Sequence, residues 1–203
     1  DKGRRTNAAD RRKVVDRRTL PMEDGGVRHA SWSEQKIQFL TRYLFILLGL
    51  LFFNLAPDIK PAWMSLRQIN ACFALMTLVN TVNFWHASQN LFCVVRYRFA
   101  MWLDIVGVSI SVLNDPYEIP PSLIVYILVV LGNGMRYGMP FFAEAVIASF
   151  AGGSSALVMR QMHSGMVVPP GMIFLTVFSA IVLVYAYILM GRIENSRTQL
   201  EHS

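Results

Sequence analysis

The stretch LGNGMRYGMP, Leu131–Pro140, decides how the rest of the sequence is interpreted. It lies between two apolar runs, and it places Arg136 between Gly134 and Gly138. A charged side chain is costly in hydrocarbon, so in membrane proteins such a residue faces the interior of a helical bundle or a cavity. Glycines four residues apart let a second helix approach closely. The stretch therefore predicts the end of a membrane-spanning helix and a turn into the next span.

The composition also favours a membrane protein. Charged residues make up 16% of the 203 residues, against roughly 25% in soluble domains. Ten of the 19 Lys and Arg residues lie between Asp1 and Lys36, and a basic segment before a span is typical of the cytoplasmic side. No aromatic residue precedes Trp32 and acids interrupt the basic residues, which argues against nucleic-acid binding. We expect residues 1–30 to form a disordered, basic cytoplasmic tail.

Six apolar segments follow the tail, and a spanning helix needs about 17–25 residues. We therefore expect an all-α, polytopic transmembrane bundle over residues 31–191, with a helix start near Ser31. The predicted spans are 37–55, 63–87, 99–113, 121–137, 140–158 and 170–191. The third and fourth are short, so five spans with a re-entrant segment is an alternative. Lys and Arg are more frequent in the connections on the side of the tail, which predicts that both termini are cytoplasmic.

Ionisable and amide residues gather at the cytoplasmic ends of the predicted spans. The candidate ligand-binding or switch residues are Arg136, Asp104, Glu144, Asn133, Tyr137, His86 and Asn83. An unpaired charge in hydrocarbon costs several kcal/mol, so we expect Arg136 to pair with Asp104, Glu144 or both. Two interpretations stay open, because an ion pair that holds the bundle together and one that receives an anionic ligand look alike in sequence. His86 is either an interfacial histidine or a pH sensor.

Small residues at helical spacing predict close helix packing. The glycines expected at such contacts are Gly132, Gly134, Gly138, Gly152 and Gly153. The sequence contains no His/Cys ligand set, nucleophile motif or phosphate-binding loop, so we expect no metal, no cofactor and no catalytic residue. Ile193 and Leu200 lie seven residues apart, which suits a coiled coil. We expect residues 192–203 to begin a cytoplasmic signalling helix that leads to an output domain.

Two motifs resemble a known family. RYRFAMWLDIVGVSI (Arg96–Ile110) is followed by VVLGNGMRYG (Val129–Gly138). Together they resemble the membrane input region of the hybrid sensor histidine kinases that detect diffusible signal factors, which are cis-2-unsaturated fatty acids. The resemblance covers about half of the chain, from Arg96 to Gly191. The matching residues are Arg96, Arg98, Asp104, Gly132, Asn133, Gly134, Arg136, Tyr137 and Gly138. Glu144 and the basic tail have no counterpart in the family pattern.

The resemblance implies the sensory input domain of a two-component hybrid histidine kinase in the bacterial cytoplasmic (inner) membrane. It implies a fatty-acid-like ligand, and we expect a homodimer embedded in the lipid bilayer. The ligand carboxylate would compete for Arg136 and release Asp104, and the sixth span would pass the shift onward. The alternatives are an input domain for a diguanylate or adenylate cyclase, a small transporter or channel subunit, and a dimerising membrane anchor.

Overall fold

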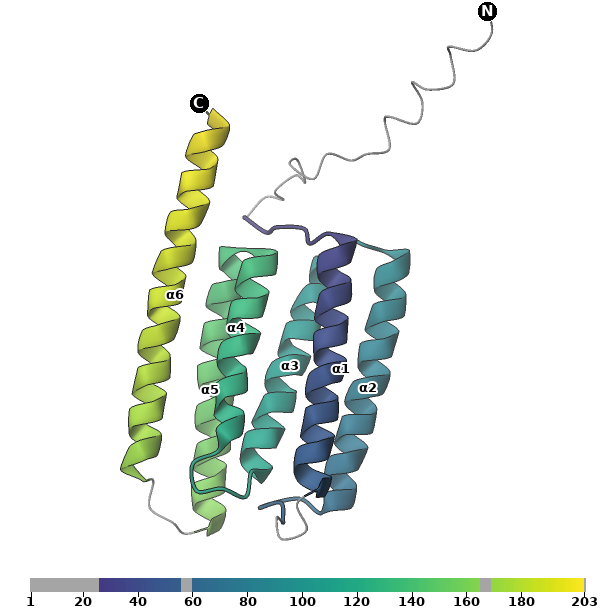
Figure 1. Ribbon diagram of the computed structural model, residues 1–203, viewed down its shortest axis with the longest axis vertical. Coiled ribbons are helices and arrows are strands. Elements are labelled where there is room, and N and C mark those ends of the chain that lie inside the picture. The colour runs from purple at the N-terminus through teal and green to yellow at the C-terminus, as the bar shows by residue number, and fades with distance from the viewer. Residues whose placement is uncertain (1–25, 56–59, 165–168, 203) are drawn as a thin grey trace, which may run out of the picture.

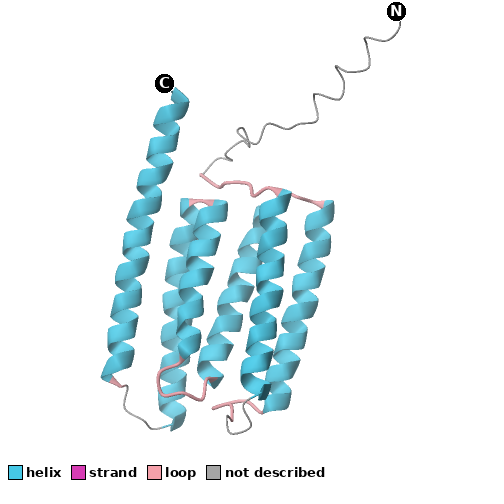
Figure 2. Cartoon of the chain, in the orientation of Figure 1, coloured by secondary structure: helices cyan, strands magenta, loops and turns pink. Residues whose placement is uncertain are grey.

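The computed structural model describes residues 26–55, 60–164 and 169–202, which form an all-helical bundle (Figures 1 and 2). Its elements are α1 (Trp32–Leu55), α2 (Leu66–Gln89), α3 (Val94–Asn114), the 3-10 helix η2 (Pro121–Leu123), α4 (Ile124–Tyr137), α5 (Met139–Ser164) and α6 (Pro170–His202). The predicted all-α class is confirmed, and each predicted span overlaps one α-helix. The start of α1 and the end of α6 lie at the same end of the bundle (Figure 1).

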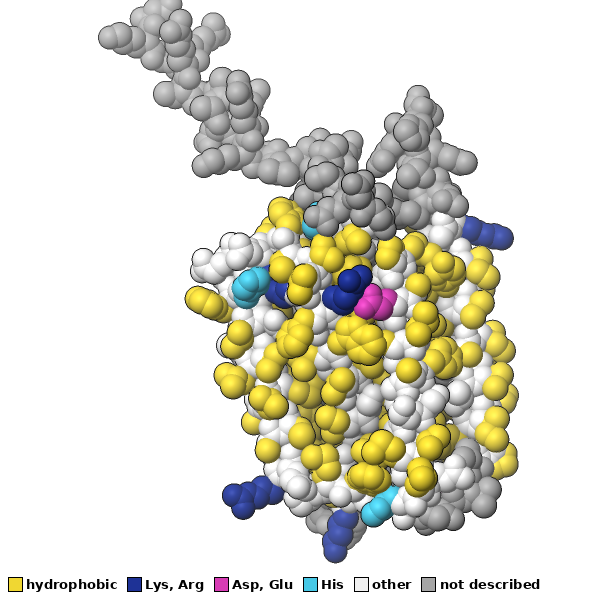
Figure 3. Space-filling view, turned by 180° about the vertical axis from the view of Figure 1, so that it is seen from behind, with side chains coloured by type: hydrophobic (Ala, Val, Ile, Leu, Met, Phe, Trp, Pro, Cys, Tyr) yellow, Lys and Arg dark blue, Asp and Glu magenta, His cyan; other side chains and the backbone are white. Residues whose placement is uncertain are grey.

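In the part of the chain that the structure describes, three helical stretches are long and apolar enough to cross a membrane: Trp32–Leu55, Met139–His163 and Pro170–Ile193. Many large apolar side chains on the helix surfaces are exposed, and on one face of the bundle they surround only a few charged groups (Figure 3). These features indicate a membrane protein. α4 is shorter: its 14 residues rise about 21 Å, against a hydrocarbon core of about 30 Å. Six spans therefore stays a prediction.

The start of α1 is fixed by the capping box that the sequence indicates. The backbone N–H of Ser31 donates to the Glu34 carboxylate at 2.7 Å, and the N–H of Glu34 donates to Ser31 Oγ at 3.4 Å. These bonds satisfy N–H groups that a helix start leaves without intrahelical partners. The prediction of a helix start near Ser31 is confirmed.

The predicted tail ends earlier than residue 30. Residues 1–25 lie outside the described ranges, but residues 26–30 pack onto the turn between α4 and α5. The Arg28 N–H donates to the Tyr137 carbonyl at 3.0 Å, and Ala30 is fully buried. Residues 26–30 are therefore part of the folded domain, contrary to the prediction, because their backbone bonds to the end of α4.

The described residues form two apolar clusters. The larger joins α3, α4 and α5, and the smaller joins α1 and α2. Tyr97, Tyr126, Tyr137, Phe141 and Phe142 are the largest rings of the first cluster, and Ile46, Phe53, Ile69 and Phe73 form the second. The α1–α2 hairpin thus has a core of its own, separate from the core of the α3–α5 unit. Space between the two units is the structural origin of the cavity described below.

Three of the predicted glycine contacts are confirmed. A Cβ at Gly134 would collide with Phe142 of α5, so the two helices touch at this glycine. Gly152 and Gly153 of α5 pack against α3 and against the Tyr126 ring of α4. Gly138 has φ +91° and ends α4, as the predicted turn requires, because this backbone region favours glycine. The atoms nearest to a Cβ at Gly138 belong to Gly26 and Arg28, so the expected contact with another helix is not found there.

Candidate functional site

A cavity of about 490 Å³ lies between α1, α2, α3 and α4. Its volume is within the range of about 300–1,000 Å³ that small-molecule sites occupy. Arg136, near the end of α4, lines one end, and Ser122 of η2 lines the other. The helical rise between these two residues is about 20 Å. We refer to the two extremes as the Arg136 end and the Ser122 end of an elongated cavity.

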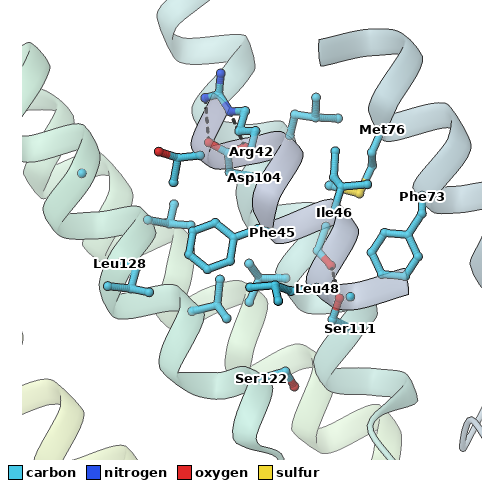
Figure 4. Close-up of a pocket in the computed structure, with 18 of the residues that line it drawn as sticks. Arg42, Phe45, Ile46, Leu48, Phe73, Met76, Asp104, Ser111, Ser122 and Leu128 are labelled. Carbon is cyan, nitrogen blue, oxygen red and sulfur yellow. Dashed lines mark hydrogen bonds and ion pairs between the residues drawn. The ribbon is translucent and has the colours of Figure 1, made fainter. Parts of the chain in front are cut away.

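The long walls of the cavity are apolar, and one side is open. Figure 4 shows Phe45 and Leu48 on α1, with Leu128 of α4 on one side of them and Phe73 and Met76 of α2 on the other. Leu48 is 49% exposed and Leu128 is 48% exposed, although both line the cavity. The cavity therefore opens sideways between α1 and α4, onto an apolar surface of the bundle.

An ion pair between α1 and α3 forms part of the Arg136 end. Arg42 Nε donates to Asp104 Oδ1 at 2.7 Å, and Arg42 Nη2 donates to Asp104 Oδ2 at 2.7 Å (Figure 4). The side chains are only 10% and 16% exposed. A bidentate arginine–carboxylate pair is among the strongest charged contacts in proteins. Both carboxylate oxygens of Asp104 therefore accept a hydrogen bond from Arg42.

Arg136 points back into the cavity from the last turn of α4. Side chains on an α-helix lean toward its N-terminus, which for Arg136 is the direction of the cavity interior. A Cβ at Gly132 would lie 3.5 Å from Arg136 Nη1, so the guanidinium lies over this glycine. Gly132 thus lies on the cavity wall and not at a contact between helices, contrary to the prediction.

Among the residues that the structure describes, none forms a hydrogen bond or an ion pair with the Arg136 guanidinium. The Arg136 end therefore holds two guanidinium groups, from Arg42 and Arg136, against the single carboxylate of Asp104. Its formal charge is +1. A net positive charge at the end of an apolar cavity attracts an anion, because the low-dielectric surroundings screen it weakly.

The predicted pairing of Arg136 with Asp104 or Glu144 is wrong. Gly134 marks the face of α4 that touches α5, and Arg136 lies two residues later, about 200° around the helix. Arg136 consequently faces away from α5, the helix that carries Glu144. Asp104 lines the same cavity, but its carboxylate is directed to Arg42 on α1.

Glu144 belongs to a different cluster. Its carboxylate accepts a hydrogen bond from Arg98 Nε at 2.9 Å and one from Trp102 Nε1 at 3.0 Å, both on α3. Arg98 is more than half exposed, so this pair lies at the surface of the bundle. Glu144 is not among the cavity-lining residues.

Amide side chains complete the Arg136 end. Asn133 and Asn80 are both buried, and each lines the cavity. Their amide nitrogens donate to backbone carbonyls, but among the described residues their Oδ1 atoms have no hydrogen-bond donor. Buried polar atoms without partners are uncommon in folded proteins. This end is thus polar and incompletely satisfied, while the rest of the cavity is apolar, as is usual for ligand sites.

Tyr137 supports the site without facing it. Its hydroxyl donates to Gln38 Oε1, which lines the cavity, and its ring stacks on Tyr97 at 4.3 Å between centroids. Two other candidates lie elsewhere. His86 contacts Arg96 through Nδ1 at 3.3 Å, and Asn83 is buried in α2, but neither lines the cavity. The structure therefore brings Asp104, Asn133 and Arg136 together and separates them from the rest.

Sequence reasoning missed Arg42, Gln38 and Asn80 as site residues. Arg42 carried a clear signal, since it is the only charged residue between 37 and 55. An arginine inside an apolar span predicts a buried partner. Gln38 and Asn80 carried no comparable signal, because amides occur often at helix contacts within membranes.

Comparison of the chain with protein-family models, with curated proteins and with solved structures found no match.

Proposed function

We propose that this chain is the sensory input domain of a bacterial hybrid histidine kinase and that it binds a fatty-acid-type signal within the membrane. The observation that carries the proposal is the elongated apolar cavity that ends beside Arg136, whose guanidinium forms no hydrogen bond or ion pair with any described residue. The acyl chain lies between α1 and α4, and the carboxylate reaches Arg136. The resemblance of the Arg96–Ile110 and Val129–Gly138 motifs to the receptors for diffusible signal factors supports the same ligand class.

The charge at the Arg136 end favours a ligand with a single negative charge. One carboxylate would neutralise the formal charge of +1, whereas a dianionic phosphate would leave an excess negative charge in an apolar site. Because Arg42 already holds Asp104, the ligand binds Arg136 without first breaking an ion pair. This replaces the expectation that ligand binding releases Asp104.

Signal relay follows the contacts of α4. Ligand binding favours the state of the bundle in which Arg136 faces the carboxylate, and it acts only through its different affinity for the two states. α4 touches α5 where Gly134 meets Phe142, and the Phe142 ring lies 5.6 Å from the Tyr187 ring of α6. α6 continues to His202, well beyond its apolar part. A shift of α4 is thereby passed to the helix that leads to the output domain.

The decisive experiment measures fatty-acid binding to the protein in lipid nanodiscs by displacement of a fluorescent fatty acid. We predict that Arg136→Ala weakens binding of a cis-2-unsaturated fatty acid about 10- to 100-fold, because one charged hydrogen-bonding partner is lost. Arg136→Lys keeps the charge but not the planar fork, so it should weaken binding less.

Arg98→Ala is the matched control, because it removes an arginine of similar depth that pairs with Glu144 outside the cavity. We expect it to leave the affinity unchanged. Equal affinity of the wild type and Arg136→Ala, with both folded, would refute the proposed site. If an output domain follows Ser203, its sequence distinguishes a kinase output from a cyclase output.

A further inference from the structure

The Ser122 end of the cavity is closed by a buried carboxylate. Asp115 is fully buried at the end of α3, and it accepts hydrogen bonds from the Tyr117 N–H, the Ser122 N–H and the Ser122 hydroxyl at 3.1, 3.3 and 2.8 Å. Hydrogen bonds to a buried charge are stronger than neutral ones. They hold the connection between α3 and η2 in one conformation, and Asp115 and Ser122 line the cavity there.

The hairpin connection between α1 and α2 is tied to the same end. The Ala62 N–H donates to the Asn114 carbonyl at 3.1 Å, and the Met64 N–H donates to Asn114 Oδ1 at 2.7 Å. The Phe52 ring of α1, which lines the cavity, lies 6.1 Å from the Tyr117 ring. The floor of the cavity is thus built from both units of the bundle and is fixed by hydrogen bonds.

We propose that the cavity measures the length of a single acyl chain between Arg136 and this floor. The inference rests on the proposed function, because it takes the carboxylate to be held by Arg136. An extended chain advances about 1.2 Å per bond, since three backbone bonds of an extended peptide cover about 3.6 Å. The Arg136 side chain occupies the first part of the roughly 20 Å available, which leaves room for a chain of about 12 carbons.

Longer and shorter chains bind less well for different reasons. A shorter chain leaves apolar wall uncovered, and each missing methylene should weaken binding about fourfold. A longer chain meets the hydrogen-bonded loop of Asp115 and must bend out of the side opening next to Leu128. Affinity should therefore pass through a maximum with chain length, whereas simple partition into the bilayer rises steadily.

Val125 gives the test variant. It lines the cavity about one helical turn after Ser122, on the same face of the helix and nearer to Arg136. We expect Val125→Phe to fill the lower part of the cavity and to move the optimum to chains shorter by about four carbons, the equivalent of one turn. Phe52→Ala removes bulk from the floor and should move the optimum to longer chains.

The experiment compares straight-chain fatty acids of about 8 to about 16 carbons on wild type and variants in nanodiscs. Ile124→Phe is the matched control, because Ile124 precedes Val125 but is 64% exposed and does not line the cavity. It should leave the optimum unchanged. Opposite shifts for Val125→Phe and Phe52→Ala support the proposal.

Two results overturn the length-measuring role. One is a steady rise of wild-type affinity over the whole series, and the other is an optimum that neither variant moves. If binding still depends on Arg136 in these cases, the proposed function stands and only the length selection fails. Absence of Arg136-dependent binding at every length overturns both.

Discussion

Arg42 and Asp104 form the most buried ion pair among the described residues. Removing one partner leaves the other charge unpaired in a site with little water. We predict that Arg42→Leu and Asp104→Leu each lower the free energy of unfolding by about 3–5 kcal/mol. The double variant should recover most of the loss, because it removes both charges. Thermal unfolding in detergent, followed by circular dichroism, measures the stability of the wild type, of both single variants and of the double variant, which together form a double-mutant cycle.

Arg98→Leu serves as the reference in that cycle. It breaks an arginine–carboxylate pair that is more exposed, and exposed pairs contribute about 0–1 kcal/mol. A loss at Arg98 as large as the loss at Asp104 would contradict the interpretation of a buried pair. Additive losses in the double variant would contradict it as well, because two interacting charges cannot be independent.

At the scale of single residues, the sequence identified the important arginine but not its surroundings. Arg136 is found because a charge in LGNGMRYGMP is improbable without a role. Its partners were predicted wrongly because depth in the membrane does not define the face of a helix. Gly134 and Arg136 lie about 200° apart around α4, so Gly134 contacts α5 while Arg136 faces the cavity. The sequence gives this angle, but it does not show which face of α4 meets α5.

At the scale of elements, the contact between α4 and α5 depends on Gly134. We predict that Gly134→Ala lowers the free energy of unfolding by about 1–3 kcal/mol, because the added Cβ collides with Phe142 and the two helices must separate. Gly153→Ala is the matched control. A Cβ there would lie 3.4 Å from the nearest atom of Tyr126, which is close to ordinary contact.

Thermal unfolding of both variants tests this prediction. The same variant also bears on the proposed relay, because α4 contacts α5 at this glycine. A Gly134→Ala protein as stable as the wild type would show that the helices accommodate the methyl group. In that case the close approach of α4 to α5 at Gly134 would not contribute to the stability of the fold.

The helix boundaries show which sequence signals were reliable. The capping box predicted the start of α1 well, whereas the apolar count placed the third segment at 99–113 and α3 begins at Val94. Counting apolar residues left Arg96 out of the predicted helix. The Arg96 guanidinium is nevertheless buried and donates to Gln35 Oε1 at 2.7 Å. Hydropathy alone treats such an arginine as solvent-exposed, so it shortens the helix.

At the scale of the whole molecule, the start of α1 and the end of α6 lie on one side (Figure 1). We predict that both are cytoplasmic, because the basic residues gather there. Single cysteines at Arg192 and Lys60, in a chain with Cys72 and Cys93 replaced by serine, test this arrangement. In intact cells a membrane-impermeant thiol reagent should label Lys60→Cys and should label Arg192→Cys only after the cells are opened.

Labelling of both cysteines from outside would contradict an even number of crossings. Labelling of Arg192→Cys alone would mean that the orientation is inverted. In both cases the side from which α6 reaches an output domain would change. The proposed cytoplasmic kinase would then be excluded.

The cavity itself was beyond the reach of the sequence. Hydropathy and spacing predicted six helical segments, but the cavity exists because the α1–α2 hairpin has its own core and packs incompletely on the α3–α5 unit. Which helices share a core depends on the fit of side chains such as Phe53 and Phe73. The sequence shows that these residues are apolar, but it does not show which residues they contact in the fold.

The separation of Arg42 and Asp104 along the chain has a consequence for biogenesis. Arg42 lies 62 residues before Asp104, so α1 reaches the membrane well before its partner has been synthesised. Until α3 arrives, the guanidinium is best placed among lipid headgroups, where a long side chain can keep its charge hydrated. We therefore expect α1 to stay near the membrane surface or the insertion machinery and to settle only after α3 has been made.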